Sequence, residues 1–260
     1  MSKKRSAATR HADSQAASAR AAAIREEQDR KERRRRSLVV TGIVVVVLAL
    51  LLGVGYAVQA GRDDSTGSAA TGTAPAGAVS GLAVPAGEAS APVQVVVYED
   101  FMCPYCGQFE AAGRSAFGED IADGRVQFQY HVLNFLDRSS STDYSTRAAN
   151  ALAVVLDTSG QTVAKRFHDL LFENQPEEGG AGLSDDQLVD LAVQAGATES
   201  AVRPGVEGLD FEGWVDEVTD RASKDGVNAT PTVRVDGEAV EADDIDGMVR
   251  EVQAAIDAGQ

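Results

Sequence analysis

The sequence predicts an α/β domain with an inserted helical block, preceded by one transmembrane helix. Three observations lead to this fold class. Residues 37–61 contain no charged side chain. From Pro92 onward, β-rich and amphipathic runs follow one another in the order β-α-β, several helices, then β-β-α. The chain also has only two cysteines, Cys103 and Cys106, and they stand where the first of these helices is predicted to begin.

The N-terminal segment, residues 1–37, is strongly basic. Residues 1–36 hold 12 of the 24 Lys and Arg side chains but only 5 of the 40 Asp and Glu side chains. We expect a disordered or loosely helical tail that stays in the cytoplasm, because basic segments next to a membrane span favour that side. Residues 61–260 are then expected outside the cytoplasm, held at the cell membrane by a single pass.

Residues 38–60 form the predicted transmembrane helix. The run LVVTGIVVVVLALLLGVGYAV, residues 38–58, is long enough to cross a bilayer core of about 30 Å at about 1.5 Å per helical residue. A cleaved signal peptide is the competing interpretation, because Val58-Gln59-Ala60 resembles a cleavage site. The long basic segment and the length of the apolar run favour an uncleaved anchor.

Residues 61–91 are rich in Gly, Ala, Ser, Thr and Pro, which predicts a flexible tether. Beyond residue 36 the chain carries 12 basic and 35 acidic side chains, a formal charge of −23. A domain this acidic repels nucleic acid and anionic lipid, so we expect no nucleic-acid partner.

The remaining residues are predicted to form one domain, 92–260. Its predicted strands are 93–98, 125–133, 232–235 and 238–240, the last two joined by a turn at Asp236-Gly237. One helix is predicted to begin at Pro104. Five further helices are predicted at 144–156, 162–172, 184–195, 211–224 and 243–258. Ser184 and Gln187 have the spacing of a capping box. Trp214, the only tryptophan, is expected to pack the inserted helices.

The spacing Cys103-Pro104-Tyr105-Cys106 indicates a redox site. At a helix start, two cysteines at this spacing are within disulfide range, and the helix dipole lowers the pKa of the first thiol. Cys103 is then the nucleophile and Cys106 the resolving thiol. A purely structural disulfide is less consistent with the sequence, because so small a loop adds little stability.

Zinc binding is a second alternative. Cys103 and Cys106 together with His131 and His168 would make a Cys₂His₂ set. The two histidines fall on different predicted elements, one on a strand and one on a helix. Each is expected to be a packing or surface residue, and we expect no metal.

The segment Ala229-Thr230-Pro231-Thr232 precedes a predicted strand. Proline is tolerated at a strand start, and an X-Pro bond is where a cis peptide occurs. Alone this is weak evidence, but it becomes informative beside a C-x-x-C motif.

The stretches EDFMCPYC and VNATPTVRVDGE, with the helical block between them, resemble DsbA-like thiol-disulfide oxidoreductases of the thioredoxin superfamily, in their membrane-anchored actinobacterial form. The resemblance covers about residues 92–260. C-P-Y-C is also the glutaredoxin motif, but the 125 residues from Cys106 to Pro231 are too many for glutaredoxin. They leave room for an inserted helical domain at about 139–226.

The resemblance implies a thioredoxin fold and a role for each residue of the motif. Cys103 is the exposed nucleophile and Cys106 the partly buried resolving cysteine. Pro231 is the cis-proline that faces them, and Thr230 offers backbone groups to an extended substrate. Pro104 and Tyr105 belong to the motif and the substrate groove. The redox-active disulfide itself requires no added cofactor.

Two positions depart from the family pattern. Many relatives carry a buried carboxylate six residues before the first cysteine, where this chain has Val97. Glu99 lies on the same strand face and is the candidate proton acceptor, although a solvated acid at a strand end is the simpler interpretation. Tyr105 replaces the histidine of the strongly oxidising type and cannot add positive charge near the thiolate, which predicts a milder oxidant.

The function expected from these features is oxidation of exported proteins with free thiols. A membrane reoxidant of the DsbB or vitamin K epoxide reductase type would restore the disulfide. An anchored reductase or isomerase is the first alternative, and a peptide-binding chaperone module is the second. Phe101 is expected to line either the groove or the core.

Overall fold

The structure is a computed structural model that describes residues 72–259. The predicted cytoplasmic tail, the predicted span and the first part of the predicted tether lie outside these residues. Within 72–259, none of the helices combines the length and the apolar character that a membrane crossing needs.

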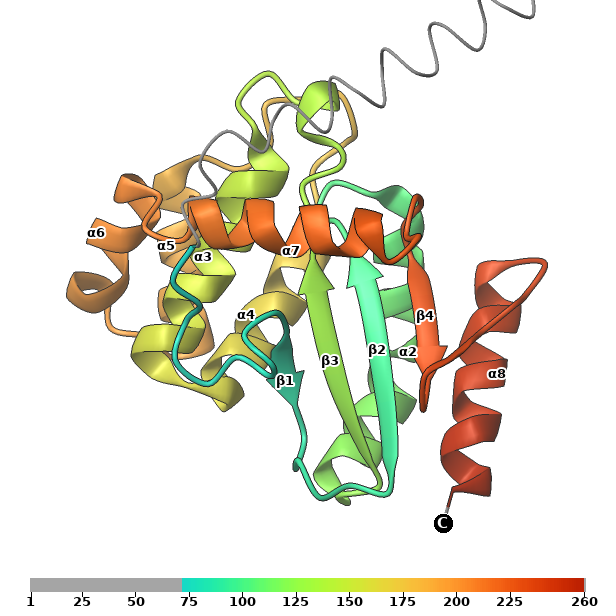
Figure 1. The fold of residues 1–260 in the computed structure, drawn as a ribbon. Coiled ribbons are helices and arrows are strands. Elements are labelled where there is room, and N and C mark those ends of the chain that lie inside the picture. Colours follow the sequence, from blue (N-terminus) through green and yellow to red (C-terminus); the bar gives the residue numbers. More distant parts are fainter. Residues whose placement is uncertain (1–71, 260) are drawn as a thin grey trace, which may run out of the picture. The chain divides into compact units, whose positions relative to one another are not determined.

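A five-stranded mixed sheet forms the centre of the domain, in the order β1-β3-β2-β4-β5 (Figure 1). β2 and β3 are parallel, whereas β1, β4 and β5 each run antiparallel to their neighbours. The strands are β1 Val84–Ala86, β2 Val93–Glu99, β3 Val126–Val132, β4 Thr232–Val235 and β5 Glu238–Ala239. The strands predicted at 93–98, 125–133, 232–235 and 238–240 are therefore confirmed to within one residue or two.

The central strand β2 is apolar because both faces of the sheet are covered. Val93, Val95 and Val97 are fully buried on one face, and on the other face Val96 is partly buried and Tyr98 is buried. In Figure 1, α2 (Pro104–Ala122) lies behind the sheet and α7 (Glu212–Lys224) crosses in front of the upper ends of β2 and β3. Helices on both faces explain why this strand is a nearly continuous valine run.

The helices predicted between β3 and β4 are present. They are α3 Tyr144–Ser159, α4 Gln161–Glu173, α5 Asp185–Ala195 and α7, and a short 3₁₀ turn, η1 Asp137–Ser139, precedes them. The last helix is α8 Ile245–Ala258. The capping box of α5 is confirmed, since the Ser184 hydroxyl accepts from Gln187 N and the Gln187 side chain accepts from Ser184 N.

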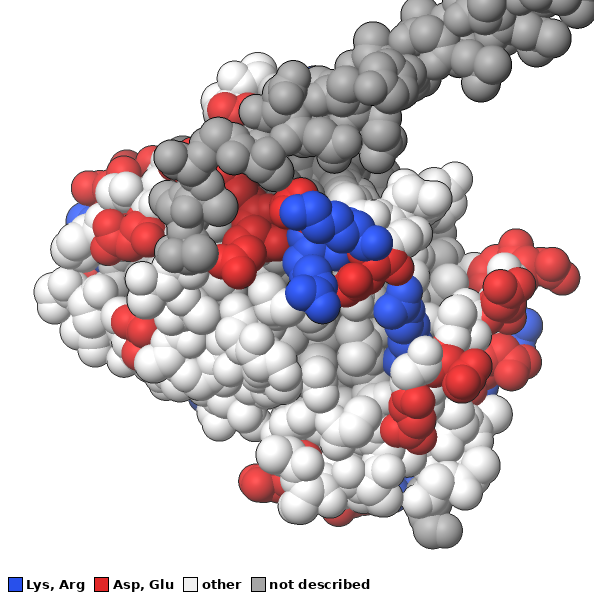
Figure 2. Space-filling view, viewed as in Figure 1, with Lys and Arg blue, Asp and Glu red and all other residues white. Residues whose placement is uncertain are grey.

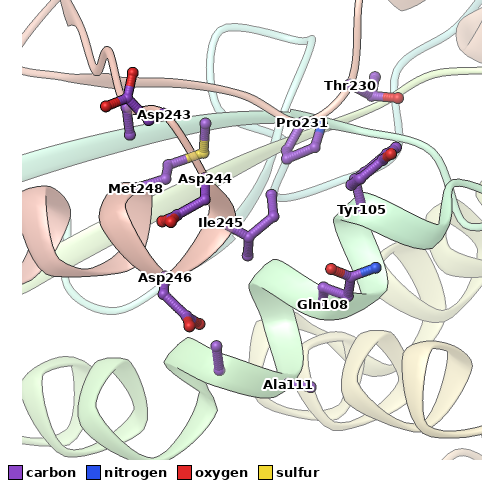
Figure 3. A pocket seen from close by; sticks show the side chains of 12 residues that line it. Tyr105, Gln108, Ala111, Thr230, Pro231, Asp243, Asp244, Ile245, Asp246 and Met248 are labelled. Atoms are coloured by element: carbon purple, nitrogen blue, oxygen red, sulfur yellow. The ribbon is translucent and has the colours of Figure 1, made fainter.

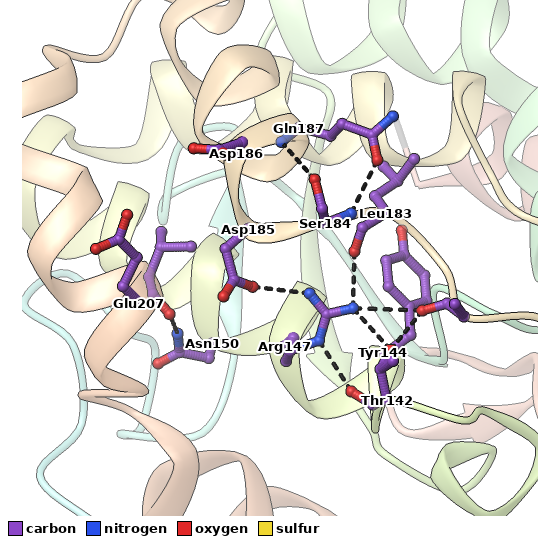
Figure 4. A network of polar contacts seen from close by, with 12 residues as sticks. Thr142, Tyr144, Arg147, Asn150, Leu183, Ser184, Asp185, Asp186, Gln187 and Glu207 are labelled. Atoms are coloured by element: carbon purple, nitrogen blue, oxygen red, sulfur yellow. Dashed lines mark hydrogen bonds and ion pairs between the residues drawn. The ribbon is translucent and has the colours of Figure 1, made fainter.

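Arg147 joins α3 to the start of α5 (Figure 4). Its guanidinium is 2.7 Å from Asp185 Oδ1 and donates to the carbonyl oxygens of Leu183 at 2.7 Å and Thr142 at 2.9 Å. One planar side chain thus holds two loops and a helix end, which fixes the helical block as a unit.

One helix and one strand were not predicted. α6 (Glu199–Gly208) contains Pro204 and Gly205 in its interior. These residues disfavour helix in isolation, so no helix is expected there from sequence; in the structure Val202 and Val206 are buried in the core.

The predicted tether, 61–91, is wrong in its last part. Val84–Ala86 is strand β1, paired with β3, and Ala83, Val84 and Ala86 are buried. The Trp214 indole also donates to the Gly81 carbonyl oxygen at 2.7 Å. Trp214 is fully buried in the core, as predicted. Its hydrogen bond to Gly81 also holds the segment before β1 against α7. The small residues that suggested flexibility instead allow close packing against β3 and α7.

Candidate active site

The cysteine pair lies where β2 gives way to α2. Cys103 is the N-cap of α2, with extended backbone (φ −74°, ψ 116°), and Pro104 occupies the first helical turn. Cys106 lies one turn further in. Both thiols are free, and both are buried. The expectation of an exposed Cys103 is wrong, since only 5% of it is exposed, and Cys106 is fully rather than partly buried, because the Thr230 loop and the sheet cover the start of α2. The first sulfur therefore lies at the positive end of the helix, as predicted.

The environment of Cys103 favours its thiolate. A hydrogen bond from the Cys106 side chain lowers its pKa most; burial opposes this, and the Thr230 side chain and the backbone N–H groups of Cys106 and Tyr105 also lower it. The result is a pKa of about 6. At neutral pH most of this cysteine is ionised when the protein is reduced.

Cys106 has the opposite environment. Burial, the hydrogen bond to Cys103, and the negative charges of Cys103 and Glu99 all raise its pKa well above the ordinary value. Two thiols three residues apart therefore differ in protonation. The environment favours the thiolate at Cys103 and the protonated thiol at Cys106.

The loop before β4 lies against this pair. β4 is antiparallel to β2, with Thr232 opposite Tyr98, and this pairing brings Thr230 to the cysteines. The Cys103 Sγ atom is 3.3 Å from the Thr230 carbonyl oxygen, and the Thr230–Pro231 peptide bond is cis. The two stretches that carried the resemblance thus meet at one point.

A groove of about 810 Å³ opens beside the pair (Figure 3). Tyr105, Gln108, Thr230 and Pro231 line it next to the cysteines, and the first turn of α8 lines the far side. Tyr105 is 61% exposed, although it is a large aromatic residue. Figure 2 shows acidic side chains gathered over the start of α8, where Asp243, Asp244 and Asp246 border the groove.

Phe101, for which two roles remained open, belongs to the core. It is 1% exposed, and its ring centroid lies 5.0 Å from that of Phe172 and 5.7 Å from that of His168. It forms part of the apolar layer below the cysteines and does not line the groove.

The interpretation of Glu99 as a solvated acid is wrong. Its side chain is fully buried, and its Oε1 lies 2.6 Å from His168 Nε2. The alternation of side chains along the strand correctly placed Glu99 on the same buried face as Val97. Nothing in the sequence indicated that its partner would be His168, which lies 69 residues away on α4. Glu99 therefore remains the candidate proton acceptor, now with a buried site and an electrostatic effect on Cys106.

His168 is also not the simple packing residue that was expected. It is fully buried, and although burial opposes its charged form, the Glu99 carboxylate raises its pKa to about 9. Glu110 on α2 completes a buried group of three, with ligand atoms of all three residues within 4.8 Å of one another. Burial, together with the charge of Glu99, raises the pKa of Glu110 to about 7, against the attraction of His168.

The alternative Cys₂His₂ set is not assembled. Across the described residues, the group with metal-ligand spacing is Glu99, Glu110 and His168, without either cysteine. His131 instead packs against Tyr98, with ring centroids 4.7 Å apart and the rings tilted by 35°, and burial lowers the pKa of His131 to about 4.

Two residues that sequence reasoning missed hold the active-site loop. Asp100 is buried and accepts from Met102 N and Leu136 N at 2.9 Å and from the Ser145 hydroxyl at 2.6 Å. Burial raises its pKa to about 6 despite these hydrogen bonds. An acidic residue beside a C-x-x-C motif was visible in the sequence, but its partners are on other elements.

Gln175, just after α4, is the second missed residue. Its amide nitrogen donates to Cys103 O at 2.8 Å and to Phe101 O at 3.1 Å. Gly107 leaves the space for this amide, since a Cβ there would collide with it. No sequence signal points to Gln175, because its role depends on where the inserted helices end.

The fold and the cysteine pair define a member of the thioredoxin family. A family model described as thioredoxin matches residues 81–258, and the chain belongs to that family. The match begins before residue 92, in agreement with the observed strand β1.

Within this family the chain belongs to the DsbA-like thiol-disulfide oxidoreductases. Reduced DsbA from Mycobacterium tuberculosis is similar, at 30% identity and a TM-score of 0.57 over 68% of this chain and 96% of that one. The disulfide bond formation protein D of Bacillus subtilis is 29% identical over 160 residues, which is 59% of this chain and 68% of that protein.

A serine/threonine-protein kinase, PknE of Mycobacterium tuberculosis, is 34% identical over 129 residues, or 48% of this chain. The matched part is 23% of the kinase, so this chain spans less than a quarter of it. The kinase's name therefore says nothing about the activity of the domain described here.

Proposed function

We propose that the chain is an extracytoplasmic oxidant that introduces disulfides into exported proteins through the Cys103–Cys106 pair. The observation that carries this proposal is the contrast between the two thiols: the pKa of Cys103 is lowered to about 6 and that of Cys106 is raised. A stabilised thiolate at Cys103 favours the reduced enzyme, and a protein whose reduced form is stabilised is an oxidant.

The reaction is two exchanges. A substrate thiolate attacks the Cys103 sulfur of the enzyme disulfide, the bond to Cys106 breaks, and Cys106 leaves with the electron pair and takes up a proton. A second substrate thiolate then attacks the substrate sulfur of the mixed disulfide and expels Cys103 as a thiolate. The substrate loses two electrons and the cysteine pair gains them, so no cofactor beyond the pair is required.

The groove supplies the substrate site. An extended segment placed beside Thr230 and Pro231 would present its cysteine to Cys103 Sγ, which already contacts the Thr230 carbonyl at 3.3 Å. The exposed ring of Tyr105 supports apolar contact on the other side. Main-chain pairing of this kind tolerates many sequences, which suits an enzyme with many substrates.

The cellular setting is also proposed. The apolar run 38–60 and the basic residues before it support a single-pass anchor in the cell membrane with the catalytic domain outside. The reduced pair would pass its electrons to a membrane reoxidant of the DsbB or vitamin K epoxide reductase type.

The test is the reduction potential of the full-length chain in detergent, measured against glutathione. A potential above that of glutathione supports the oxidant. A low, thioredoxin-like potential overturns it and favours a reductase or isomerase fed with electrons across the membrane. Full retention of function by Cys103→Ser would favour the chaperone module instead.

A further inference from the structure

The side chain of Gln175 reaches the backbone of the nucleophile from the inserted helices. α4 ends at Glu173, and Gln175 follows two residues later. Its Nε2 atom donates to Cys103 O at 2.8 Å and to Phe101 O at 3.1 Å. These acceptors lie 72 and 74 positions earlier in the chain, in the loop between β2 and α2. The helical block therefore contacts the active site at the peptide group of Cys103 itself.

Two donors converge on the Cys103 carbonyl oxygen. Besides Gln175, the backbone N–H of Gly107 donates to it at 3.2 Å. This second bond is the first hydrogen bond of α2, because Cys103 is the N-cap of that helix. A carbonyl oxygen has two lone pairs, so both are engaged here. The bond to Gly107 begins the helix, and the bond to Gln175 holds the same oxygen from outside it.

Gly107 provides the space for this contact. A Cβ atom at residue 107 would collide with the amide of Gln175, whose atoms are the three that it would meet first. The backbone of Gly107 is helical and does not have a positive φ, so its conformation does not require glycine. Glycine is a poorer helix former than alanine. A glycine in the first turns of α2 is therefore explained by the amide that lies against it.

The same loop is also held from its other end. The Asp100 carboxylate accepts from Met102 N at 2.9 Å and from the Ser145 hydroxyl on α3 at 2.6 Å. Gln175 binds the carbonyl oxygens of the residues on either side of Met102. Successive peptide groups before α2 are thus tied to α3 and to the end of α4, which leaves the loop little freedom to rotate.

The orientation of this loop decides which groups the Cys103 sulfur meets. The groups that lower the pKa of Cys103 are the Cys106 thiol, Thr230, and the backbone N–H groups of Tyr105 and Cys106. An N-cap side chain reaches the N–H groups of the first turn only while its own backbone is extended, and Cys103 has φ −74° and ψ 116°. Rotation of the Cys103 carbonyl would change ψ and turn the first helical turn relative to the sulfur.

We propose that Gln175 is a positioning residue for the nucleophile. Its amide fixes the Cys103 carbonyl and so keeps the sulfur beside the hydrogen-bond donors of the first helical turn. Through this contact the inserted helical block contributes to the stability of the thiolate, and hence to the oxidising strength of the pair. Gln175 acts through the backbone and not on the reacting sulfur atoms. The consequence for oxidising strength rests on the proposed function.

The first test displaces the amide without changing Gln175. In Gly107→Ala the added methyl group takes the space of the amide, which then leaves the Cys103 carbonyl. Alanine favours helix, so α2 is expected to form normally. We expect the pKa of Cys103, measured from the thiolate absorbance of the reduced full-length protein in detergent, to rise by about 0.5–1. Gly118→Ala, at an exposed position of α2 with open space around it, is the matched control and is expected to match the wild type.

The second test removes the donor. Gln175→Met fills the space of the side chain but cannot donate a hydrogen bond, whereas Gln175→Ala loses both the volume and the donor. Both variants are expected to raise the pKa of Cys103 as Gly107→Ala does. If Gln175 acted by packing alone, Gln175→Met would match the wild type, and the proposal would be overturned. Gln194→Met, at an exposed position of α5, is the control.

The redox equilibrium with glutathione is a separate readout on the same proteins. Because the reduced form loses part of its stabilisation, the equilibrium in Gly107→Ala and Gln175→Met is expected to shift toward the oxidised enzyme by about three- to tenfold. A loss of global stability alone would lower the midpoint of unfolding and would leave this equilibrium of the folded protein unchanged.

A double variant tests whether the two changes act through one contact. Gln175→Ala leaves room for a methyl group at residue 107, so adding Gly107→Ala to it is expected to change the pKa of Cys103 no further. Two full shifts that add in the double variant would overturn the proposal. So would a wild-type pKa and a wild-type glutathione equilibrium in both Gly107→Ala and Gln175→Met.

The outcomes separate this inference from the proposed function. A low, thioredoxin-like potential of the wild type would overturn the oxidant, while the pKa shifts between variants would still establish the positioning role. A high wild-type potential with unshifted pKa values in the variants would overturn only the role of Gln175.

Discussion

The Cys103 sulfur lies 3.3 Å from the carbonyl oxygen of Thr230, a residue 127 positions further along the chain. This contact unites the motif at the start of α2 with the loop that precedes β4, and it depends on the antiparallel pairing of β2 with β4. In the proposed function, substrate that binds along that loop would reach the thiol whose pKa is lowered.

Replacing the resolving cysteine tests how the thiolate is stabilised. The Cys106 thiol supplies the hydrogen bond that lowers the pKa of Cys103 most. In Cys106→Ala we expect the pKa of Cys103 to rise by about 1 or more, toward its ordinary value. The pKa of Cys103 is measured from the thiolate absorbance of the reduced protein. In Cys106→Ser, which keeps a hydroxyl donor, the pKa of Cys103 is expected to lie between the values in the wild type and in Cys106→Ala. An unchanged pKa in Cys106→Ala would mean that the helix terminus, not the Cys106 thiol, stabilises the thiolate.

Gln175→Ala removes two hydrogen bonds from the active-site loop, those to Cys103 O and Phe101 O. Because the Phe101 carbonyl then loses this partner and the Cys103 carbonyl keeps only Gly107 N, the free energy of unfolding is expected to fall by about 1–3 kcal/mol. Denaturant unfolding of the reduced protein provides the measurement. Gln194→Ala, at an exposed position of α5, is the matched control; an equal loss in both variants would contradict the role of Gln175.

Trp214→Phe tests the fastening of the segment before β1. The variant keeps an aromatic ring but loses the 2.7 Å hydrogen bond to Gly81 O and part of the buried area. We expect a stability loss of about 1–3 kcal/mol. We also expect faster proteolysis of residues 72–91 than in the wild type, and unchanged cleavage there would show that β1 pairing holds the segment without the tryptophan.

The stability of Glu110→Gln is expected to depend on pH in a defined way. Burial raises the pKa of Glu110 in the folded state to about 7 from its ordinary 4.5. Between these values the unfolded chain releases this proton while the folded chain keeps it, so the wild type loses stability as pH rises through that window.

Gln has no proton to lose, so the free energy of unfolding of Glu110→Gln does not fall across this window. Above the window the variant is expected to be more stable than the wild type by a constant difference of about 1–3 kcal/mol. Urea unfolding of both proteins in the reduced state at mildly acidic and mildly basic pH measures the difference. Glu119→Gln provides the baseline. A constant difference across the window would mean that Glu110 is already ionised in the fold at low pH.

The acidic border of the groove predicts a preference among substrates. Asp243 and Asp246 are exposed beside the groove, whereas Asp244 is engaged in capping α8, with its Oδ1 2.6 Å from Gly247 N. A peptide with Lys beside its cysteine is expected to react several-fold faster than a peptide with Glu at that position. The ratio of the two rates is expected to be smaller at high salt, because salt screens the charges. Asp243→Asn with Asp246→Asn should reduce this ratio, while the exposed control Asp190→Asn should not. Equal rates for both peptides would exclude an electrostatic contribution.

Local patterns predicted most elements correctly. Valine runs marked β2, Ser184 with Gln187 marked the start of α5, and Pro104 marked the start of α2. The errors fell where tertiary packing overrides local preference. Pro204 and Gly205 lie in a helix because its valines are buried, and Val84–Ala86 forms a strand because β3 offers an unpaired edge.

The sequence by itself was enough to predict a thiol-disulfide oxidoreductase and to assign its proposed site to the cysteine pair. Two cysteines at this spacing before a helix, with no others in the chain, specify a nucleophile and a resolving thiol because helix geometry and the helix dipole are local properties. Only the tertiary structure decided how the buried thiol is supported. Glu99 and His168 are 69 positions apart, and they form a buried pair only because the fold removes both from water and sets Glu99 Oε1 2.6 Å from His168 Nε2.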